Sequence, residues 1–237
     1  IRFSNITIET TLDSSPSIDK PSGSYPIFLD IERRKPDGPI SYIRNIHFSD
    51  ITINTKDGHC LFLGQPDQHI EELYLTNISY HLEKHLPFAG NKKPRGVRSL
   101  TDRAANDYSH IPANFAFAHV SNMHMNNLHI TDDDVSGLHE RHMIWGYDVH
   151  NVTIDHFDNI IKDANQELAQ LQFEDATGIE ISSSKPTHTV SPFLHLKGAS
   201  TRDVVLLNNN FSQLDQIIEA ESAVNNKTII EFNNVKK

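Results

Sequence analysis

The stretch IRFSNITI at residues 1–8 decides the fold, because the chain repeats it along its length. Apolar residues alternate with polar ones, as in a β-strand with one buried face, and Asn or Asp interrupts the alternation halfway. These two residue types tolerate the left-handed backbone of a tight bend, so the phrase predicts strand, bend, strand. The clear copies are IHFSDITI at 46–53, LYLTNISY at 73–80 and MHMNNLHI at 123–130, and weaker copies start at Val152, Val204 and Ile230.

The spacing of the copies identifies the architecture. Successive start positions differ by 45, 27, 50, 29, 52 and 26 residues. The short intervals fit one coil of a stacked solenoid, and the long ones fit two coils or one coil carrying a loop. We therefore predict an all-β chain, a single-stranded right-handed parallel β-helix of about seven coils. Period-2 alternation points these side chains inward: Phe3, Ile46, Phe48, Leu73, Leu75, Met123, Met125, Val152 and Ile154.

The bend residues of the copies should lie above one another in the stack. Hydrogen bonds between neighbouring coils would then link their side chains, which is a structural role rather than a catalytic one. The predicted set is Asn5, Asp50, Asn77, Asn127, His156, Asn208 and Asn234.

We expect one β-helix domain over residues 1–237, with loop insertions at about 11–25 and 82–111 that build walls beside a binding groove. Only residues 163–171 (DANQELAQL) have a helical pattern. The chain opens inside a strand phrase with no capping element, whereas solenoids need caps at both ends. We therefore expect N-terminal coils to be missing, the sequence being the downstream part of a longer protein.

Composition excludes several classes of partner. The formal net charge of -10 argues against nucleic acid and against an anionic membrane. No apolar run reaches the roughly 20 residues that span a bilayer. The single cysteine, Cys60, lies in the apolar run CLFL and is expected to be a buried structural thiol. We expect no cofactor.

Three stretches are more specific than the repeat. They are YPIFLDIERRKPDGPI at 25–40 with YIRNIHFSDITI at 42–53, GHCLFLGQPDQHI at 58–70 with EELYLTNI at 71–78, and IPA at 111–113 with FAHV at 117–120. Together they resemble the downstream coils of family 28 glycoside hydrolases, the polygalacturonases and related pectin-backbone enzymes, particularly long bacterial members. The resemblance covers residues 1 to about 160.

That resemblance implies a parent enzyme that is an inverting, secreted or periplasmic glycoside hydrolase. The family's catalytic motifs, Asn-x-Asp, an Asp pair, Gly-His-Gly and Arg-x-Lys, lie upstream of coils like these and are not found here in that order. The nearest mimics are Asp57-Gly-His59 and the triplet Asp132 to Asp134, which we interpret as turns. We therefore assign no catalytic residue and expect the isolated chain to be inactive.

The resemblance also suggests how substrate could bind. Glu32, Arg33, Arg34 and Lys35 would stand beside the groove, where guanidinium groups pair with galacturonate carboxylates. The equally weighted alternative is a solvated turn with internal ion pairs. His139-Glu-Arg-His142 lacks the helical spacing of a zinc motif, so we predict no metal ligand.

Three functions compete. The leading hypothesis is the C-terminal β-helix portion of a pectin-directed glycoside hydrolase, which binds acidic polysaccharide and is completed by an N-terminal segment or a second chain. The second is a non-catalytic carbohydrate-binding or structural β-helix. The third is a β-helix polysaccharide lyase, for which Asp132 to Asp134 would be the calcium site.

Overall fold

The computed structural model describes residues 1–10, 25–31, 38–84, 108, 111–135, 140–187 and 189–237. Within them the structure is almost entirely β, with one 3₁₀ turn, η1 (Asn226–Thr228). No helix of these residues is long and apolar enough to cross a membrane. The strands are β1 (Arg2–Thr10), β2 (Phe28–Asp30), β3 (Arg44–Thr55), β4 (Cys60–Leu63), β5 (Ile70–Leu82), β6 (Ala113–Asp132), β7 (His142–Ile161), β8 (Leu171–Glu174), β9 (Thr177–Ser182), β10 (Leu194–Lys197), β11 (Arg202–Leu207), β12 (Ile218–Ala220) and β13 (Ile229–Phe232).

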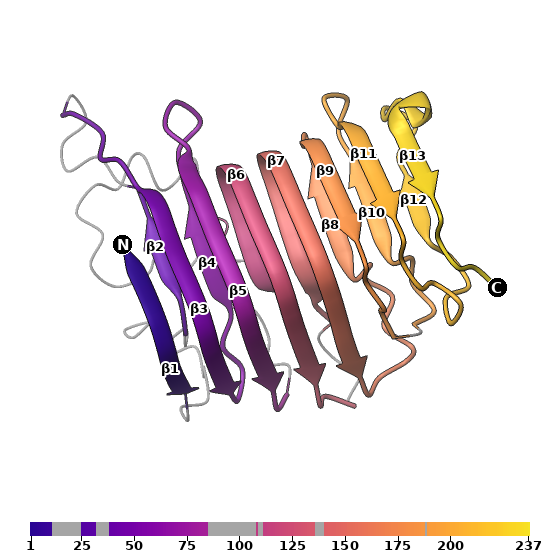
Figure 1. The fold of residues 1–237 in the computed structure, drawn as a ribbon, viewed down its shortest axis with the longest axis horizontal. Coiled ribbons are helices and arrows are strands. Elements are labelled where there is room, and N and C mark those ends of the chain that lie inside the picture. Colours follow the sequence, from indigo (N-terminus) through magenta and orange to yellow (C-terminus); the bar gives the residue numbers. More distant parts are fainter. Residues whose placement is uncertain (11–24, 32–37, 85–107, 109–110, 136–139, 188) are drawn as a thin grey trace.

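The strands form two parallel stacks that run the length of the molecule (Figure 1). The first stack has the order β1-β3-β5-β6-β7-β9-β11-β13, and the second has the order β2-β4-β6-β7-β8-β10-β12. The long strands β6 and β7 belong to both stacks, because each continues around the turn from the second stack into the first. Every pairing between these named strands is parallel, so the chain is a parallel β-helix, as predicted.

Left-handed residues mark where each coil turns, and they fall into three aligned sets. The first contains Asn5, Asp50, Asn77, Asn127, His156, Ser183, Asn208 and Asn233, the second contains Asn45, Glu72, Asn122, Asn151, Gly178 and Asp203, and the third contains His119, Asp148, Asp175 and Gly198. Side chains of the first set hydrogen-bond between coils, Asn127 to Asn77 at 3.0 Å and Asn77 to Asp50 at 2.8 Å. The predicted stacking of the bend residues is confirmed, except that the last bend is Asn233 rather than Asn234. The predicted hydrogen bonds between coils are observed for Asp50, Asn77 and Asn127, whereas His156 pairs with Asp155 of its own coil at 2.7 Å.

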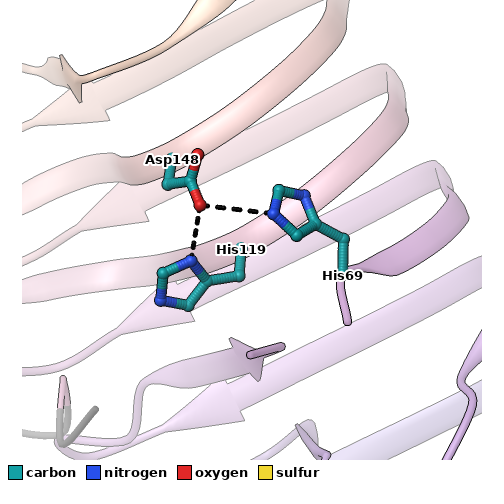
Figure 2. Close-up of side chains that lie close together, drawn as sticks. All are labelled: His69, His119 and Asp148. Carbon is teal, nitrogen blue, oxygen red and sulfur yellow. Dashed lines mark hydrogen bonds and ion pairs between the residues drawn. The ribbon is translucent and has the colours of Figure 1, made fainter. Parts of the chain in front are cut away.

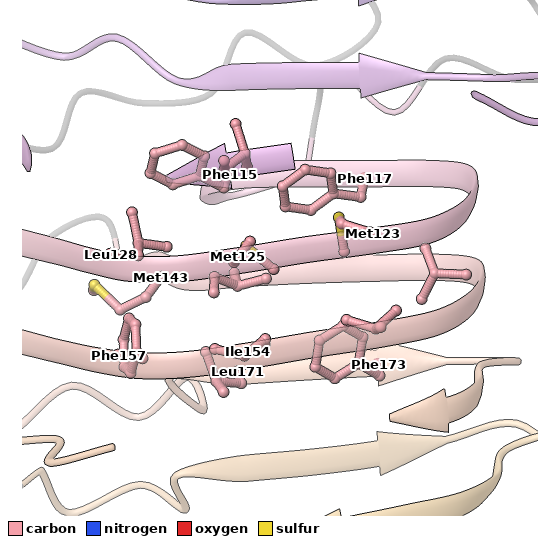
Figure 3. Packing of buried hydrophobic residues seen from close by; sticks show 14 of the residues in the cluster. Phe115, Phe117, Met123, Met125, Leu128, Met143, Ile154, Phe157, Leu171 and Phe173 are labelled. Atoms are coloured by element: carbon pink, nitrogen blue, oxygen red, sulfur yellow. The ribbon is translucent and has the colours of Figure 1, made fainter. Parts of the chain in front are cut away.

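The core is a continuous column of apolar side chains between the two stacks (Figure 3). Residues at one register position of the first stack lie above one another, as Phe48, Leu75, Met125 and Ile154 do. Burying a side chain of this size stabilises the fold by about 1.5–3 kcal/mol. Eight of the nine predicted inward residues are buried. Phe3 is 39% exposed, because among the described residues β1 pairs only with β3.

The interval between Val152 and Val204 contains two coils, which is one of the two alternatives that the spacing allowed, and β9 repeats the phrase around Ile179 with one apolar alternation instead of two. One prediction about local structure was wrong: residues 163–170 form turns and bends and Leu171 begins β8, so this segment is not a helix. The carboxylate of Glu140, one coil away, accepts hydrogen bonds from the backbone N–H groups of Glu167 and Leu168, at 2.7 and 2.8 Å. Bonds to this neighbouring coil take the place of helical ones.

A buried ion pair ties distant coils together. Arg141, before β7, contacts the carboxylate of Asp57, after β3, and both are at most 4% exposed. The guanidinium also donates to the carbonyl of Gly58 at 3.4 Å, and the Tyr80 hydroxyl donates to the same carbonyl. Removing one partner of such a pair leaves the other charge buried, which is costly.

We predict that Arg141→Leu lowers the free energy of unfolding by about 3–5 kcal/mol, because it removes the guanidinium that contacts the buried Asp57 carboxylate. Urea titration followed by circular dichroism measures the change. The control is Arg202→Leu, whose pair with Asp203 is 3.7 Å long and more than half exposed. It should cost less than about 1 kcal/mol. Equal losses in the two variants would contradict the structural role of Arg141.

Candidate functional site

The bend that joins the two strand stacks gathers an imidazole and carboxylate cluster. His119 and Asp148 occupy equivalent left-handed positions of β6 and β7, with φ of 56° and 49°. His69 immediately precedes β5, one coil earlier, and His150 lies two residues beyond Asp148 on β7. Because the coils stack in register, residues as far apart in the sequence as His69 and His150, 81 positions, lie close together. We call these four residues the His–Asp cluster.

Asp148 is the centre of the cluster (Figure 2). Its Oδ2 lies 2.7 Å from Nδ1 of His119 and 3.2 Å from Nε2 of His69. Its Oδ1 lies 3.0 Å from Nε2 of His150. The rings of His69 and His150 are stacked, with centroids 5.3 Å apart and planes 6° from parallel. Three imidazoles therefore converge on one carboxylate.

The other nitrogen of each imidazole has a hydroxyl partner. The pairs are His69 Nδ1 with Ser121 Oγ at 2.7 Å, His150 Nδ1 with Thr177 Oγ1 at 2.8 Å, and His119 Nε2 with Tyr108 Oη at 3.3 Å. A hydroxyl can donate or accept, so these partners fit either protonation state of the rings. The orientation of all three imidazoles is thereby fixed from outside the cluster.

Aromatic rings flank the cluster on the outer side of the second stack. Tyr108 has its ring centroid 5.5 Å from those of Trp145 and Tyr147, and Tyr147 meets His119 edge-on at 5.6 Å. Trp145 belongs to a second apolar cluster, outside the main core. Tyr147 is only half-buried. The site combines apolar ring surface with several polar groups, as small-ligand sites do.

The electrostatics favour an ionised Asp148 carboxylate and a neutral His69 imidazole. Burial opposes ionisation of Asp148, but the hydrogen bond from His119 and the surrounding imidazoles outweigh it, so the pKa of Asp148 lies below its usual value. Burial lowers the pKa of His69, against the pull of Asp148. A neutral imidazole has a lone pair available for a metal ion or a proton. The cluster can therefore bind a cation or exchange a proton.

The structure does not bring the sequence candidates to this site. Residues 32–35, the predicted substrate-binding segment, lie outside the described residues and that prediction stays untested. Asp132 and Asp134 are buried at the end of β6, where Asp132 accepts from the Asp134 backbone N–H at 3.1 Å. Asp133 is held by His81 and Lys162, each at 3.0 Å, and these hydrogen bonds lower its pKa.

The segment His139 to His142 also has structural surroundings. Glu140 and Arg141 make the contacts described above, and His139 lies outside the described residues. His142 is buried and its Nδ1 is 2.6 Å from the carbonyl of Ala169. Burial lowers the pKa of His142 to about 4. Asp57 and His59 are likewise buried, between β3 and β4.

Sequence reasoning did not single out the His–Asp cluster. The signal was present, because His69, His119 and Asp148 each lie four residues before the start of a repeat phrase, at Leu73, Met123 and Val152. Aligning the residues that precede each phrase, and not only the bend within it, would have stacked the three.

Comparison with known proteins adds little. No protein-family model matches the chain, and no curated protein matches it. One solved structure, described as "a putative glycosyl hydrolase from Parabacteroides merdae ATCC 43184", is similar over 81% of this chain and 83% of that one. The two are 10% identical, with a TM-score of 0.49. A likeness at this level carries no functional argument for this chain.

The buried imidazole of His142 predicts a pH dependence of stability. Its pKa falls from 6.5 in the unfolded chain to about 4 in the folded protein. Between those values the unfolded state binds more protons, so the free energy of unfolding decreases as the pH falls from 6.5 to 4. The loss attributable to His142 approaches about 3 kcal/mol.

Urea titrations at several pH values across this window measure the effect. His142→Gln, whose amide can still donate to Ala169, should reduce the slope. Some slope will remain, because burial and the charge of Arg141 lower the pKa of His59 to about 3. An unchanged slope in the variant would contradict the assignment.

Proposed function

We propose that this chain is the C-terminal β-helix portion of a pectin-directed glycoside hydrolase, whose catalytic carboxylates lie on coils that precede this sequence in the same polypeptide. In this role the chain binds acidic polysaccharide and does not cleave it alone. The proposal combines the sequence resemblance to family 28 enzymes with the β-helix fold and the surface features described above.

The observation that carries the binding role is the association of partly exposed aromatic rings with polar groups. Tyr147 of β7 and Tyr108 are partly exposed next to the His–Asp cluster, and both rings pack against the buried Trp145. Aromatic surface packs against the apolar face of a ligand, and imidazole and hydroxyl groups fix its orientation by hydrogen bonds. A sugar presents both kinds of surface.

The surroundings of Asp132, Asp133 and Asp134 support the proposal that this chain does not hydrolyse polysaccharide by itself. Inverting cleavage needs a protonated carboxyl group with a raised pKa and a second carboxylate about 6.5–9.5 Å away. The pKa of Asp133 is lowered, which is the opposite of what an acid requires. Asp132 and Asp134 are buried and joined by a local hydrogen bond.

A non-catalytic carbohydrate-binding module remains the second candidate, favoured by the same observation. The two differ in what precedes the sequence. An in-frame upstream segment with the Asn-x-Asp and Asp-Asp motifs supports the hydrolase, and its absence supports the module.

We predict that the purified chain releases no reducing sugar from polygalacturonate above a blank, yet binds this polymer weakly. The double variant Arg33→Ala/Arg34→Ala should weaken binding roughly 2- to 30-fold, since exposed charge pairs contribute about 0.2–1 kcal/mol each. Affinity should also fall as salt is raised from about 0.1 to 1 M, where screening becomes nearly complete. Affinity electrophoresis or calorimetry measures both effects.

The matched control is Lys236→Ala/Lys237→Ala, which removes the same charge at the C-terminus. These lysines pair with Glu231 and Asp215, each at 2.6 Å. Equal weakening by both double variants would show that only net charge matters. Robust sugar release that Asp133→Asn abolishes would contradict the proposal and make the triplet an active site.

A further inference from the structure

We infer that His69, His119 and Asp148 bind one divalent transition-metal ion of the zinc class. This site is additional to the proposed function and does not rest on it. The inference comes from the positions of the ligand atoms, their outer hydrogen-bond partners and the contrast with other His–Asp pairs of the same protein.

The three side chains already have nearly the spacing that an ion requires. One ligand atom from each lies within 4.8 Å of the others. Zinc bound tetrahedrally at 2.0–2.1 Å places its ligand atoms about 3.3 Å apart. The Asp148 oxygen is 2.7 and 3.2 Å from the two imidazole nitrogens, so small side-chain rotations suffice.

The outer partners have the arrangement typical of metal-binding histidines. A ligating imidazole is held by a hydrogen bond from its second nitrogen, which fixes the ring and its tautomer. Ser121 and Tyr108 occupy these positions for His69 and His119. When the inner nitrogens bind an ion, the outer N–H groups donate to these hydroxyl oxygens.

The backbone holds the ligands in place before an ion arrives. His119 and Asp148 occupy left-handed bends fixed by the stacked coils, and the His119 side chain is only 3% exposed. A methyl group on Gly64 would lie 2.2 Å from the His119 carbonyl oxygen, so this glycine permits the close approach of the neighbouring coil. Ligands fixed in this way lose little freedom on binding.

Other His–Asp contacts of the protein differ from this cluster. His129 pairs with Asp158 at 2.5 Å and His81 with Asp133 at 3.0 Å, and in each case a single imidazole contacts the carboxylate. An ordinary surface pair needs one histidine. Asp148 contacts three imidazoles, two of them through the same oxygen. The lone pairs of these nitrogen and oxygen atoms can together bind a divalent cation.

The donor set also selects the ion. Two imidazoles and one carboxylate suit zinc and its transition-metal neighbours, whereas calcium and magnesium prefer oxygen ligands throughout. Three protein ligands leave a position for water or substrate, as in catalytic zinc sites. His150, on the other oxygen of Asp148 and more than a third exposed, is a positioning residue or a fourth ligand.

The test uses the full chain without an affinity tag, stripped by a chelator and titrated with zinc chloride in a calorimeter. Cobalt(II) replaces zinc for absorption spectra, because four-coordinate cobalt absorbs visible light strongly. We expect saturable 1:1 binding, strong cobalt bands and a higher melting temperature with zinc. His119→Asn and Asp148→Asn should each raise the dissociation constant at least 100-fold, and His150→Asn about 10-fold.

Asparagine is chosen because it tolerates left-handed bends, as Asn122 and Asn151 do in this chain. Circular dichroism checks that each variant is folded. The matched control is His129→Asn, which removes a histidine from the same strand, β6, and should leave binding within twofold. Absence of 1:1 binding, or tight binding that survives both His119→Asn and Asp148→Asn, would overturn the inference. The proposed function is tested separately, by measuring whether the metal-free chain binds polygalacturonate. Failure of zinc binding and failure of polysaccharide binding can therefore be told apart.

Discussion

In-register parallel stacking of coils is the constraint on which the whole structure depends. Backbone hydrogen bonds fix the register, and a residue at a given position in one coil then lies directly above its equivalent in the next. Left-handed bends must recur at the same positions, so Asn and Asp recur there. The apolar column inside and the hydrogen-bonded ladder from Asn127 to Asp50 both follow from this repetition.

The same constraint can build a site without a dedicated motif. His69, His119 and Asp148 are ordinary surface residue types, each at the corner before a repeat phrase. Because the coils stack, the side chains of His69 and His119 lie around the carboxylate of Asp148. Hydroxyl groups of Ser121 and Thr177 complete the cluster, and these two residues are the register partners of His150 on the coils before and after it.

The fold could be predicted from the sequence because its signal is repeated. The alternation of apolar and polar residues predicted which side chains point inward. Asn or Asp in the middle of each copy predicted where the chain bends. The spacing left open whether the interval from Val152 to Val204 holds one coil or two, because the second alternation of the copy around Ile179 is interrupted. Residues 163–171 were misassigned, because a helical pattern does not reveal the hydrogen bonds that Glu140 accepts from this segment. The His–Asp cluster was not predicted because the copies were compared only within the phrase, whereas its members lie four residues before the phrase starts.

The register between β5 and β6 is the most direct test, because it spans the long insertion and sets His69 beside His119. Thr76 and Asn126 are register partners with side chains on the outer face. Their Cα atoms should be about 4.8 Å apart, within reach of a disulfide. Thr76→Cys/Asn126→Cys should therefore cross-link readily under mild oxidation. Thr76→Cys/His124→Cys, offset by two residues and about 8 Å apart, should not. Efficient cross-linking of the offset pair, or of neither pair, would contradict the stacking from which the fold and the site are derived.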